Sequence, residues 1–232
     1  MIVGKRERYV MLMASLPALG PLLGSRTPAI SAARLTERLR LLTPADRKTL
    51  EAMRAGMTWS HRDLGETDAA FLQNIDQLMT RIESATLRDA VRERLELRTL
   101  VAALRRRHAG TPAPAAGERW GYGRFLDTIR SNWTRPDFGL ARTFPWIKAA
   151  RERLEAGDSA GLERILLQAA WDSSARHTRG HIFDFEAVAC YVVRWSLADR
   201  WSHYDVATAT LRFEELLDAA TRDALPAIEM PS

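Results

Sequence analysis

The stretch FEAVACYVVRWSLADRW, residues 185–201, carries the clearest information about the fold. It is long enough for more than four helical turns but contains only four charged residues. Its apolar side chains occupy two neighbouring helix faces: Phe185, Val188, Val192 and Trp195 on one, and Cys190, Val193, Leu197 and Trp201 on the other. Because most of its circumference is apolar, the stretch predicts a helix at the centre of a bundle.

Two arginines interrupt this apolar helix, each directly before a tryptophan: Arg194 before Trp195, and Arg200 before Trp201. They have two possible roles. They can pair with acids inside the fold, or they can reach a partner protein, since tryptophan and arginine commonly anchor interfaces. The structural role is favoured because tryptophans are more often core residues than interface anchors. Three acids are candidate partners for it: Glu186, Asp199 and Glu214.

The composition is that of an ordinary globular protein. Of 232 residues, 46% are hydrophobic and 27% are charged, which argues against disorder and against a fibrous repeat. The net charge of +5 suits an anionic partner or surface. The single cysteine, Cys190, cannot form an internal disulfide, so a reducing compartment and a cytoplasmic location are expected. No apolar run is long enough to span a bilayer.

Hydrophobic residues recur at helical spacing along most of the chain, and no segment shows the alternation typical of strands. We therefore predict an all-α multi-helix bundle. The breaker-rich segment AGTPAPAAG, residues 109–117, is read as a linker between two packed helical halves, residues 1–108 and 118–232. The predicted helical stripes cover residues 30–42, 44–56, 71–82, 87–104, 147–154, 162–171 and 185–201, with a last helix starting at Val206.

Local signals indicate where some helices begin. Thr43 followed by Pro44 is typical of an N-cap and a first helical residue. Thr86 with Asp89 resembles a capping box. Near the N-terminus, a basic start and an apolar middle resemble a secretory signal, but Pro17 breaks the apolar part. We expect residues 9–19 to enter the core instead.

Aromatic residues are dense in residues 120–146, where the tryptophans are Trp120, Trp133 and Trp146. Such density predicts either a second hydrophobic core or an exposed face that a partner covers. The chain alone does not choose between the two.

No catalytic motif is complete. HRDL at 61–64 and DFG at 137–139 match fragments of the protein kinase signature, but the glycine-rich loop and the strand-rich lobe are missing. The chain also lacks a nucleophile elbow, a phosphate loop and a dinucleotide fingerprint. We therefore expect no enzymatic activity, no cofactor and no small-molecule substrate.

The segment RHTRGHIFDFE, residues 176–186, offers a weak metal-ligand pattern. His177 and His181 are four residues apart and Asp184 follows. On a helix this spacing would place both imidazoles on one face. Gly180 lies between them, however, and Asp184 is equally explained as the N-cap of the next helix. A metal site is not expected.

The basic run at 105–108 could contact phosphate, but at the end of a helix it also complements the macrodipole. Because no nucleic-acid reader module is recognisable, a nucleic-acid partner is not expected.

Several segments together resemble a known family. YVMLMASLPALG at 9–20 and LTPADRKTLEAM at 42–53 are similar to the N-terminal part of a family of unknown function whose genes lie beside those for components of bacterial V-type (A-type) ATPases. FDFEAVACYVVRWSLADRWSHYD at 183–205, with FEELL at 213–217, resembles that family's C-terminal block. The segment at 97–110 also resembles helices of the socket component of the ATPase, which is designated C in bacteria and d in eukaryotes. The residues that carry the resemblance are Tyr9, Leu12, Leu16, Pro17, Phe185, Glu186, Arg194, Trp195, Arg200 and Trp201.

The resemblance implies a non-catalytic subunit or accessory of a rotary ATPase, such as a socket of the C/d type between the central rotor and the membrane proteolipid ring. The implied partners are proteins of the central stalk and of the proteolipid ring, which would place the chain at the cytoplasmic face of the inner membrane and peripheral to it at most. The aromatic cluster at 120–146 is then the expected partner face. The competing hypotheses are a helical adaptor unrelated to ATPases and a weak nucleic-acid-binding helical protein.

Overall fold

A computed structural model describes residues 4–24, 27–57 and 68–223. Within these residues the chain forms nine α-helices, one short 3-10 helix and no strand, which confirms the all-α prediction. None of the described helices has an apolar stretch long enough to cross a membrane. The elements are α1 Lys5–Ala14, α2 Ala32–Arg38, the 3-10 helix η1 Leu39–Leu41, α3 Pro44–Met57, α4 Asp68–Arg81, α5 Ala85–His108, α6 Leu126–Ser131, α7 Ile147–Glu155, α8 Ser159–His177 and α9 Phe185–Asp223.

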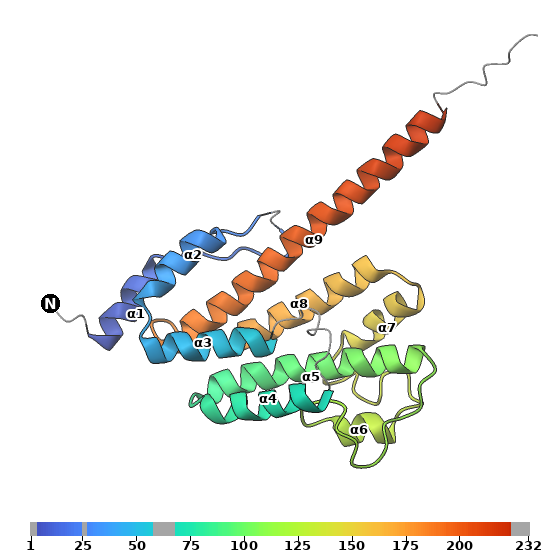
Figure 1. The fold of residues 1–232 in the computed structure, drawn as a ribbon, viewed down its shortest axis with the longest axis horizontal. Helices are drawn as coiled ribbons and strands as arrows, with labels where there is room; N and C mark the ends of the chain where they lie inside the picture. Colours follow the sequence, from blue (N-terminus) through green and yellow to red (C-terminus); the bar gives the residue numbers. More distant parts are fainter. Residues whose placement is uncertain (1–3, 25–26, 58–67, 224–232) are drawn as a thin grey trace, which may run out of the picture.

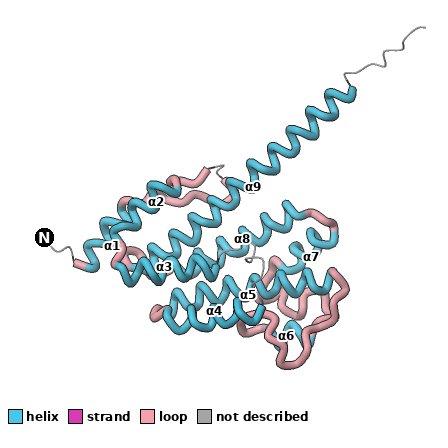
Figure 2. The backbone as a smooth tube through the Cα atoms, in the orientation of Figure 1, coloured by secondary structure: helices cyan, strands magenta, loops and turns pink. Residues whose placement is uncertain are grey.

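Helix α9 is the longest element, with 39 residues. Its first half packs against α1, α3, α5 and α8, and its second half extends beyond the other helices (Figure 1). The tube drawing shows that the helix continues without a loop (Figure 2). The prediction of a separate last helix starting at Val206 is therefore wrong. No glycine or proline occurs between residues 185 and 223 to end the helix.

Of the two helix starts predicted from capping residues, the structure confirms the one at α3 and not the one at α5. The Thr43 hydroxyl oxygen accepts a hydrogen bond from the backbone N–H of Asp46 at 3.1 Å, as expected of an N-cap. Helix α5, in contrast, is capped by Ser84, whose side chain accepts from the N–H of Leu87. The capping box at Thr86 is therefore wrong, and the Thr86 hydroxyl lies 3.2 Å from Nε2 of His181.

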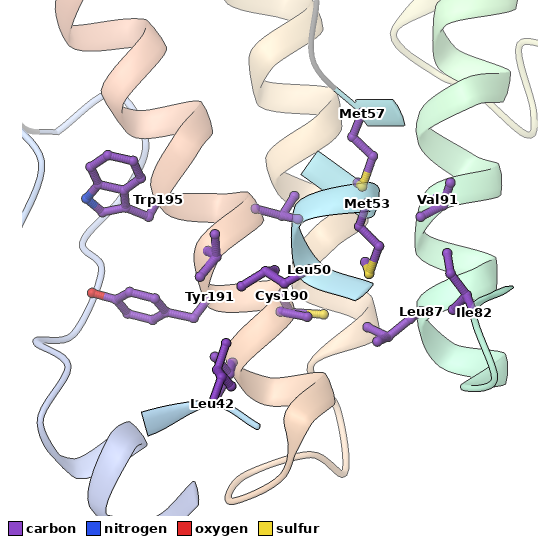
Figure 3. Packing of buried hydrophobic residues seen from close by; sticks show 14 of the residues in the cluster. Leu42, Leu50, Met53, Met57, Ile82, Leu87, Val91, Cys190, Tyr191 and Trp195 are labelled. Carbon is purple, nitrogen blue, oxygen red and sulfur yellow. The ribbon is translucent and has the colours of Figure 1, made fainter. Parts of the chain in front are cut away.

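The first hydrophobic core lies where α1, α3, the start of α5 and the first half of α9 meet (Figure 3). Cys190 is 2% exposed in its centre, and burial raises the pKa of its thiol to about 12. Residues of the predicted N-terminal core segment enter this cluster, which confirms that expectation: Tyr9, Leu12 and Leu16 are all buried.

Two polar tips fix α9 against the N-terminal segment. The buried indole N–H of Trp195 donates to the carbonyl oxygen of Ile30 at 2.7 Å. The hydroxyl of Tyr191 donates to the carbonyl oxygen of Pro17 at 2.9 Å. Each side chain buries its ring and satisfies its polar atom. The N-terminal segment is thus held to a helix more than 160 residues away in sequence.

The second core is formed by the end of α5 with α6, α7 and α8, and its buried residues include Leu97, Leu104, Ile147 and Leu166. Helices α5 and α9 belong to both cores, since α9 contributes residues such as Val188 and Trp195 to the first core and Leu197 to the second. The cores therefore do not follow the predicted halves, residues 1–108 and 118–232. The division at 109–117 stays a prediction as a domain boundary.

The chain after the predicted linker is fastened to α5 by buried polar groups. The Glu96 carboxylate, 2% exposed, accepts from the backbone N–H, Nε and Nη2 of Arg124 at 2.8–2.9 Å. The Thr99 hydroxyl accepts from the N–H of Tyr122 at 2.9 Å and donates to its carbonyl oxygen at 3.0 Å. A Cβ at Gly123 would lie 2.2 Å from Cγ of Glu96, so the loop can approach this closely only with glycine.

Candidate functional site

The aromatic residues of segment 120–146 mostly build the second core. Trp120 is 9% exposed and Phe138 is fully buried. The Arg107 guanidinium covers the Phe138 ring at 4.4 Å and donates to the carbonyl oxygen of Pro136 at 2.8 Å. Trp133 lies against the Phe138 ring, at a centroid distance of 5.5 Å. The second-core interpretation therefore accounts for these side chains, while Trp146 is half-buried at the edge of a groove.

Two of the four residues in the basic run at the end of α5 make contacts inside the fold, while Arg105 and His108 are exposed. Arg107 binds loop carbonyls, and Arg106 pairs with Glu118 at 3.2 Å. Both interactions hold the segment after α5 against the end of that helix. Arg106 and Arg107 therefore have a structural role in this part of the fold.

The two arginines of the central helix both face α8. The Nε of Arg200 donates to Glu163 at 2.6 Å. The guanidinium of Arg194 lies over the ring of Trp171, 4.1 Å from its centroid, where burial lowers the pKa of the arginine. The predicted pairing inside the fold is confirmed for Arg200, but its partner is Glu163 and not one of the nearby acids of α9.

Glu93 is the centre of a polar cluster between α5 and α8. Its carboxylate accepts from the hydroxyl of Ser173 and from Nη2 of Arg176 at 3.0 Å, and it lies 3.3 Å from Nε2 of His177. The neighbouring His177 imidazole, followed by the hydrogen bond from Ser173 and the charge of Arg176, lowers the pKa of Glu93 to about 2 against the opposing effect of burial. Because the serine donates to the carboxylate and not to the imidazole, the cluster is not arranged as a nucleophilic triad.

The metal-ligand candidates do not all come together. His177 belongs to the Glu93 cluster, whereas His181 lies in the loop before α9. Nδ1 of His181 is 2.7 Å from Asp184, whose other oxygen accepts from the N–H of Ala187 as the N-cap of α9. Potential ligand atoms of His181, Asp184 and Glu186 lie within 4.8 Å of one another. The hydrogen bonds explain the positions of His181 and Asp184 without a metal ion.

The segments that carry the family resemblance converge at the start of α9. Here α1, α3, the turn before α5 and residues 183–186 surround a hollow of about 650 Å³. Inside it, the hydroxyl of Tyr9 donates to the Asp46 carboxylate, which also accepts from Thr43 at 2.6 Å. Burial and the Asp46 carboxylate raise the pKa of Tyr9. Three separate stretches of sequence thus form one unit, held by a tyrosine–aspartate bond.

This unit carries exposed large apolar side chains on its outer surface. Among the described residues five large hydrophobic side chains are exposed, and all lie on α1, on η1 or in the loop before α9. Ile182 is 66% exposed, and Met11 and Phe183 are each 45% exposed. Arg6 lines both the hollow beside Phe183 and a shallow depression beside Met11. The pair Val10 and Met11 therefore lies on the same part of the surface as the pair Ile182 and Phe183. We call Val10, Met11, Leu41, Ile182 and Phe183 the apolar end surface.

Sequence reasoning did not identify the apolar end surface. One signal was available, because Ile182 and Phe183 are adjacent large apolar residues in a loop between two helices. Loops lie at the surface, so such a pair in a loop is a candidate for exposure. Met11 and Val10 gave no such signal, since α1 has apolar residues on several faces.

A second open feature is a groove of about 920 Å³ along α8. Its floor is α8, and aromatic side chains line it from two other elements, with Phe144 and Trp146 before α7 and Trp201 and Tyr204 from α9. All four are half-buried, and Trp201 stacks on Tyr204 at a centroid distance of 6.2 Å. Two of the residues singled out from the sequence, Trp146 and Trp201, therefore lie in one groove.

Comparison with known proteins places the chain in a family. Residues 69–224, about two thirds of the chain, match the model of a family described as protein of unknown function, DUF2764. The matched region includes the block at 183–205 but not the segments at 9–20 and 42–53. No curated protein and no solved structure matches the chain significantly. The chain belongs to the DUF2764 family.

Proposed function

We propose that this member of the DUF2764 family is a non-catalytic subunit or accessory of a bacterial V-type (A-type) rotary ATPase. It would work by contact with the central stalk and the proteolipid ring, as a socket of the C/d type. The family resemblance of the segments that form the start of α9 and its surroundings supports this proposal. The finer location, at the cytoplasmic face of the inner membrane, is part of the proposal and is compatible with a net charge of +5.

The observation that carries the proposal is the apolar end surface. Three of the five exposed large hydrophobic side chains, Val10, Met11 and Phe183, lie in segments that resemble the ATPase-associated family, and the other two, Leu41 and Ile182, directly precede such segments. Exposed apolar surface that gathers in one region is typical of protein contact sites. A contact function therefore accounts for both the resemblance and the exposure.

The arrangement of the polar groups also favours contact over chemistry. Glu93, Glu96 and Asp46 each bind at least two groups of the chain itself. Side chains bound in this way stabilise the fold and are poorly placed to transfer protons to a substrate. This supports a mechanical function for the helical body.

Co-purification from a cell that contains the ATPase tests the proposal. The tagged chain should recover proteins of the central stalk and the ring, and a Met11→Glu, Phe183→Glu double variant should recover about tenfold less, since charge placed in an apolar contact must be desolvated. A Gln73→Glu, Gln77→Glu variant adds the same charge to exposed positions of α4 and is the matched control.

Each arm has a contradicting result. If the wild-type chain recovers no component of the ATPase, the proposal fails and a helical adaptor outside the ATPase becomes the better hypothesis. If the Met11→Glu, Phe183→Glu variant recovers as much as the control, the apolar end surface is not the contact. Circular dichroism spectra of the variants verify that they are folded.

A further inference from the structure

The groove along α8 has the dimensions of a helix-binding site. Its floor runs from Gly161 to Arg176, which is roughly 22 Å along the helix axis, or about four turns. The middle of the floor presents the aliphatic side chain of Ile165 and the small side chain of Ala169. Small residues on a helix allow a second backbone to approach closely, and the half-buried aromatic side chains offer contact area at the edges.

The charges of the groove indicate what kind of helix it takes. Of the three arginines that line it, Arg153 pairs with Asp158 at 2.9 Å and Arg176 pairs with Glu93 at 3.0 Å. The third, Arg164, is exposed and has no hydrogen bond or ion pair with another residue in the described part of the chain. Its charge is thus available to a carboxylate of the occupant.

The lining carboxylates are already engaged. Asp158 also accepts from the N–H of Gly161 at 2.7 Å, Glu93 lies in its polar cluster, and Asp172 accepts from Gln168 at 2.8 Å. An occupant that brings a positive charge would compete with these bonds, whereas one that brings a negative charge meets Arg164 directly. The groove therefore favours an acidic over a basic apolar helix.

We infer that the groove along α8 binds an amphipathic helix of a partner protein, with its apolar stripe on Ile165 and the flanking aromatics and a carboxylate beside Arg164. An amphipathic helix in an apolar groove is a common mode of recognition. Trp146, Trp201 and Tyr204 are of the residue types that dominate binding energy at interfaces. This assigns a second contact surface, lined by other residues than the apolar end surface.

A peptide titration tests the inference without any part of the ATPase. The probe is a fluorescein-labelled helical peptide of about 18 residues with leucines at i, i+4 and i+7 and glutamates beside the leucine stripe. A second peptide has lysines in place of the glutamates. Fluorescence anisotropy with the full chain should show at least tenfold tighter binding of the glutamate peptide.

Charge reversal locates the site. Arg164→Glu, at an exposed position, should reverse the preference so that the lysine peptide binds more tightly. Ala149→Gln, also exposed and at the groove, should weaken both peptides by adding bulk. Arg34→Glu on α2 is the control with the same charge change and should leave the preference as it is.

Three results would overturn the inference: no binding of either peptide at millimolar concentration, equal effects of Arg164→Glu and Arg34→Glu, or a concentration-dependent dimer of the chain that Ala149→Gln abolishes. The last result would show that the occupant is a second copy. The peptides contain no ATPase sequence, so the two experiments are independent. If the peptides bind as expected but the chain recovers no ATPase component from cells, only the proposed function is contradicted and the inference about the groove stands.

Discussion

Segment 120–146 and the apolar end surface differ in how their aromatic content relates to exposure. The segment is rich in aromatic residues, yet Trp120 and Phe138 are buried and the rings pack on one another. The end surface holds fewer aromatic residues, yet Ile182 and Phe183 are exposed. The density of aromatic residues fitted either a core or a partner face in the sequence, and in the structure it belongs mostly to a core. Exposure was instead determined by position in a loop and on an outer helix face.

The burial of the aromatic segment depends on α5. Arg107 covers Phe138, and Glu96 and Thr99 hold the loop that precedes α6. These contacts turn a segment with little regular structure into part of the second core. The loop before α9 is instead fixed by polar bonds of His181 and Asp184, which leave the adjacent apolar pair outside.

The largest expected effect is the difference in stability lost when a buried and an exposed phenylalanine are each replaced by alanine. Phe138→Ala should lower the free energy of unfolding by about 3–5 kcal/mol, because it removes a fully buried ring and leaves a cavity. Phe183→Ala, at a side chain that is 45% exposed, should change it by less than about 1 kcal/mol. Urea denaturation measures both. Equal losses would contradict the difference between the two regions.

The next effect concerns the bond between the aromatic segment and α5. Glu96→Gln should cost about 1.5–3 kcal/mol, since it removes the charge that three N–H groups of Arg124 bind. Asp127→Asn is the control, because that side chain is 88% exposed in its pair with Arg130 and should contribute less than about 0.5 kcal/mol. A neutral outcome for Glu96→Gln would mean that the loop does not depend on this pair.

A smaller effect depends on pH. The pKa of Glu93 falls from 4.5 to about 2 on folding, so its ionised form stabilises the fold above pH 4.5, and this contribution is lost as the pH falls from 4.5 to 2. Glu93→Gln should lower the free energy of unfolding by about 1 kcal/mol at pH 7, a value reduced for solvent screening of this partly exposed group. The same substitution should lower it by less at pH 2. Thermal unfolding followed across this range checks the prediction. A loss that is independent of pH would contradict it.

The smallest expected effect is that of a chelator. Hydrogen bonds within the chain hold His181 and Asp184, so EDTA should leave the midpoint of thermal unfolding unchanged within about 1 °C. The measurement is a melt of the protein purified from its native cell, with and without EDTA. A fall of several degrees would contradict the prediction and show that the folded protein holds a metal ion.

Several features of the fold could be predicted from local sequence. The start of α3 follows from Thr43 and Pro44, and the central, buried position of residues 185–201 follows from apolar residues on nearly all faces. The continuity of α9 was also readable, because no glycine or proline lies between residues 185 and 223. These properties depend on neighbours along the chain.

The rest depends on which helices meet. The partner of Arg200 is Glu163 and that of Arg194 is the ring of Trp171, both on α8, and no local pattern connects them. The cap of α5 was misassigned for the same reason, since Thr86 is used by His181, 95 residues away in sequence. The α8 groove likewise exists only once α7, α8 and α9 have packed together.

Hydrogen–deuterium exchange of the chain, alone and bound to purified proteins of the central stalk and the ring, tests the central claim most directly. The apolar end surface should become protected in the complex, with the largest change in the loop at 178–184, while residues 120–146 exchange as they do in the free chain. Protection confined to residues 120–146, with the loop at 178–184 unchanged, would contradict the assignment of the end surface as the contact.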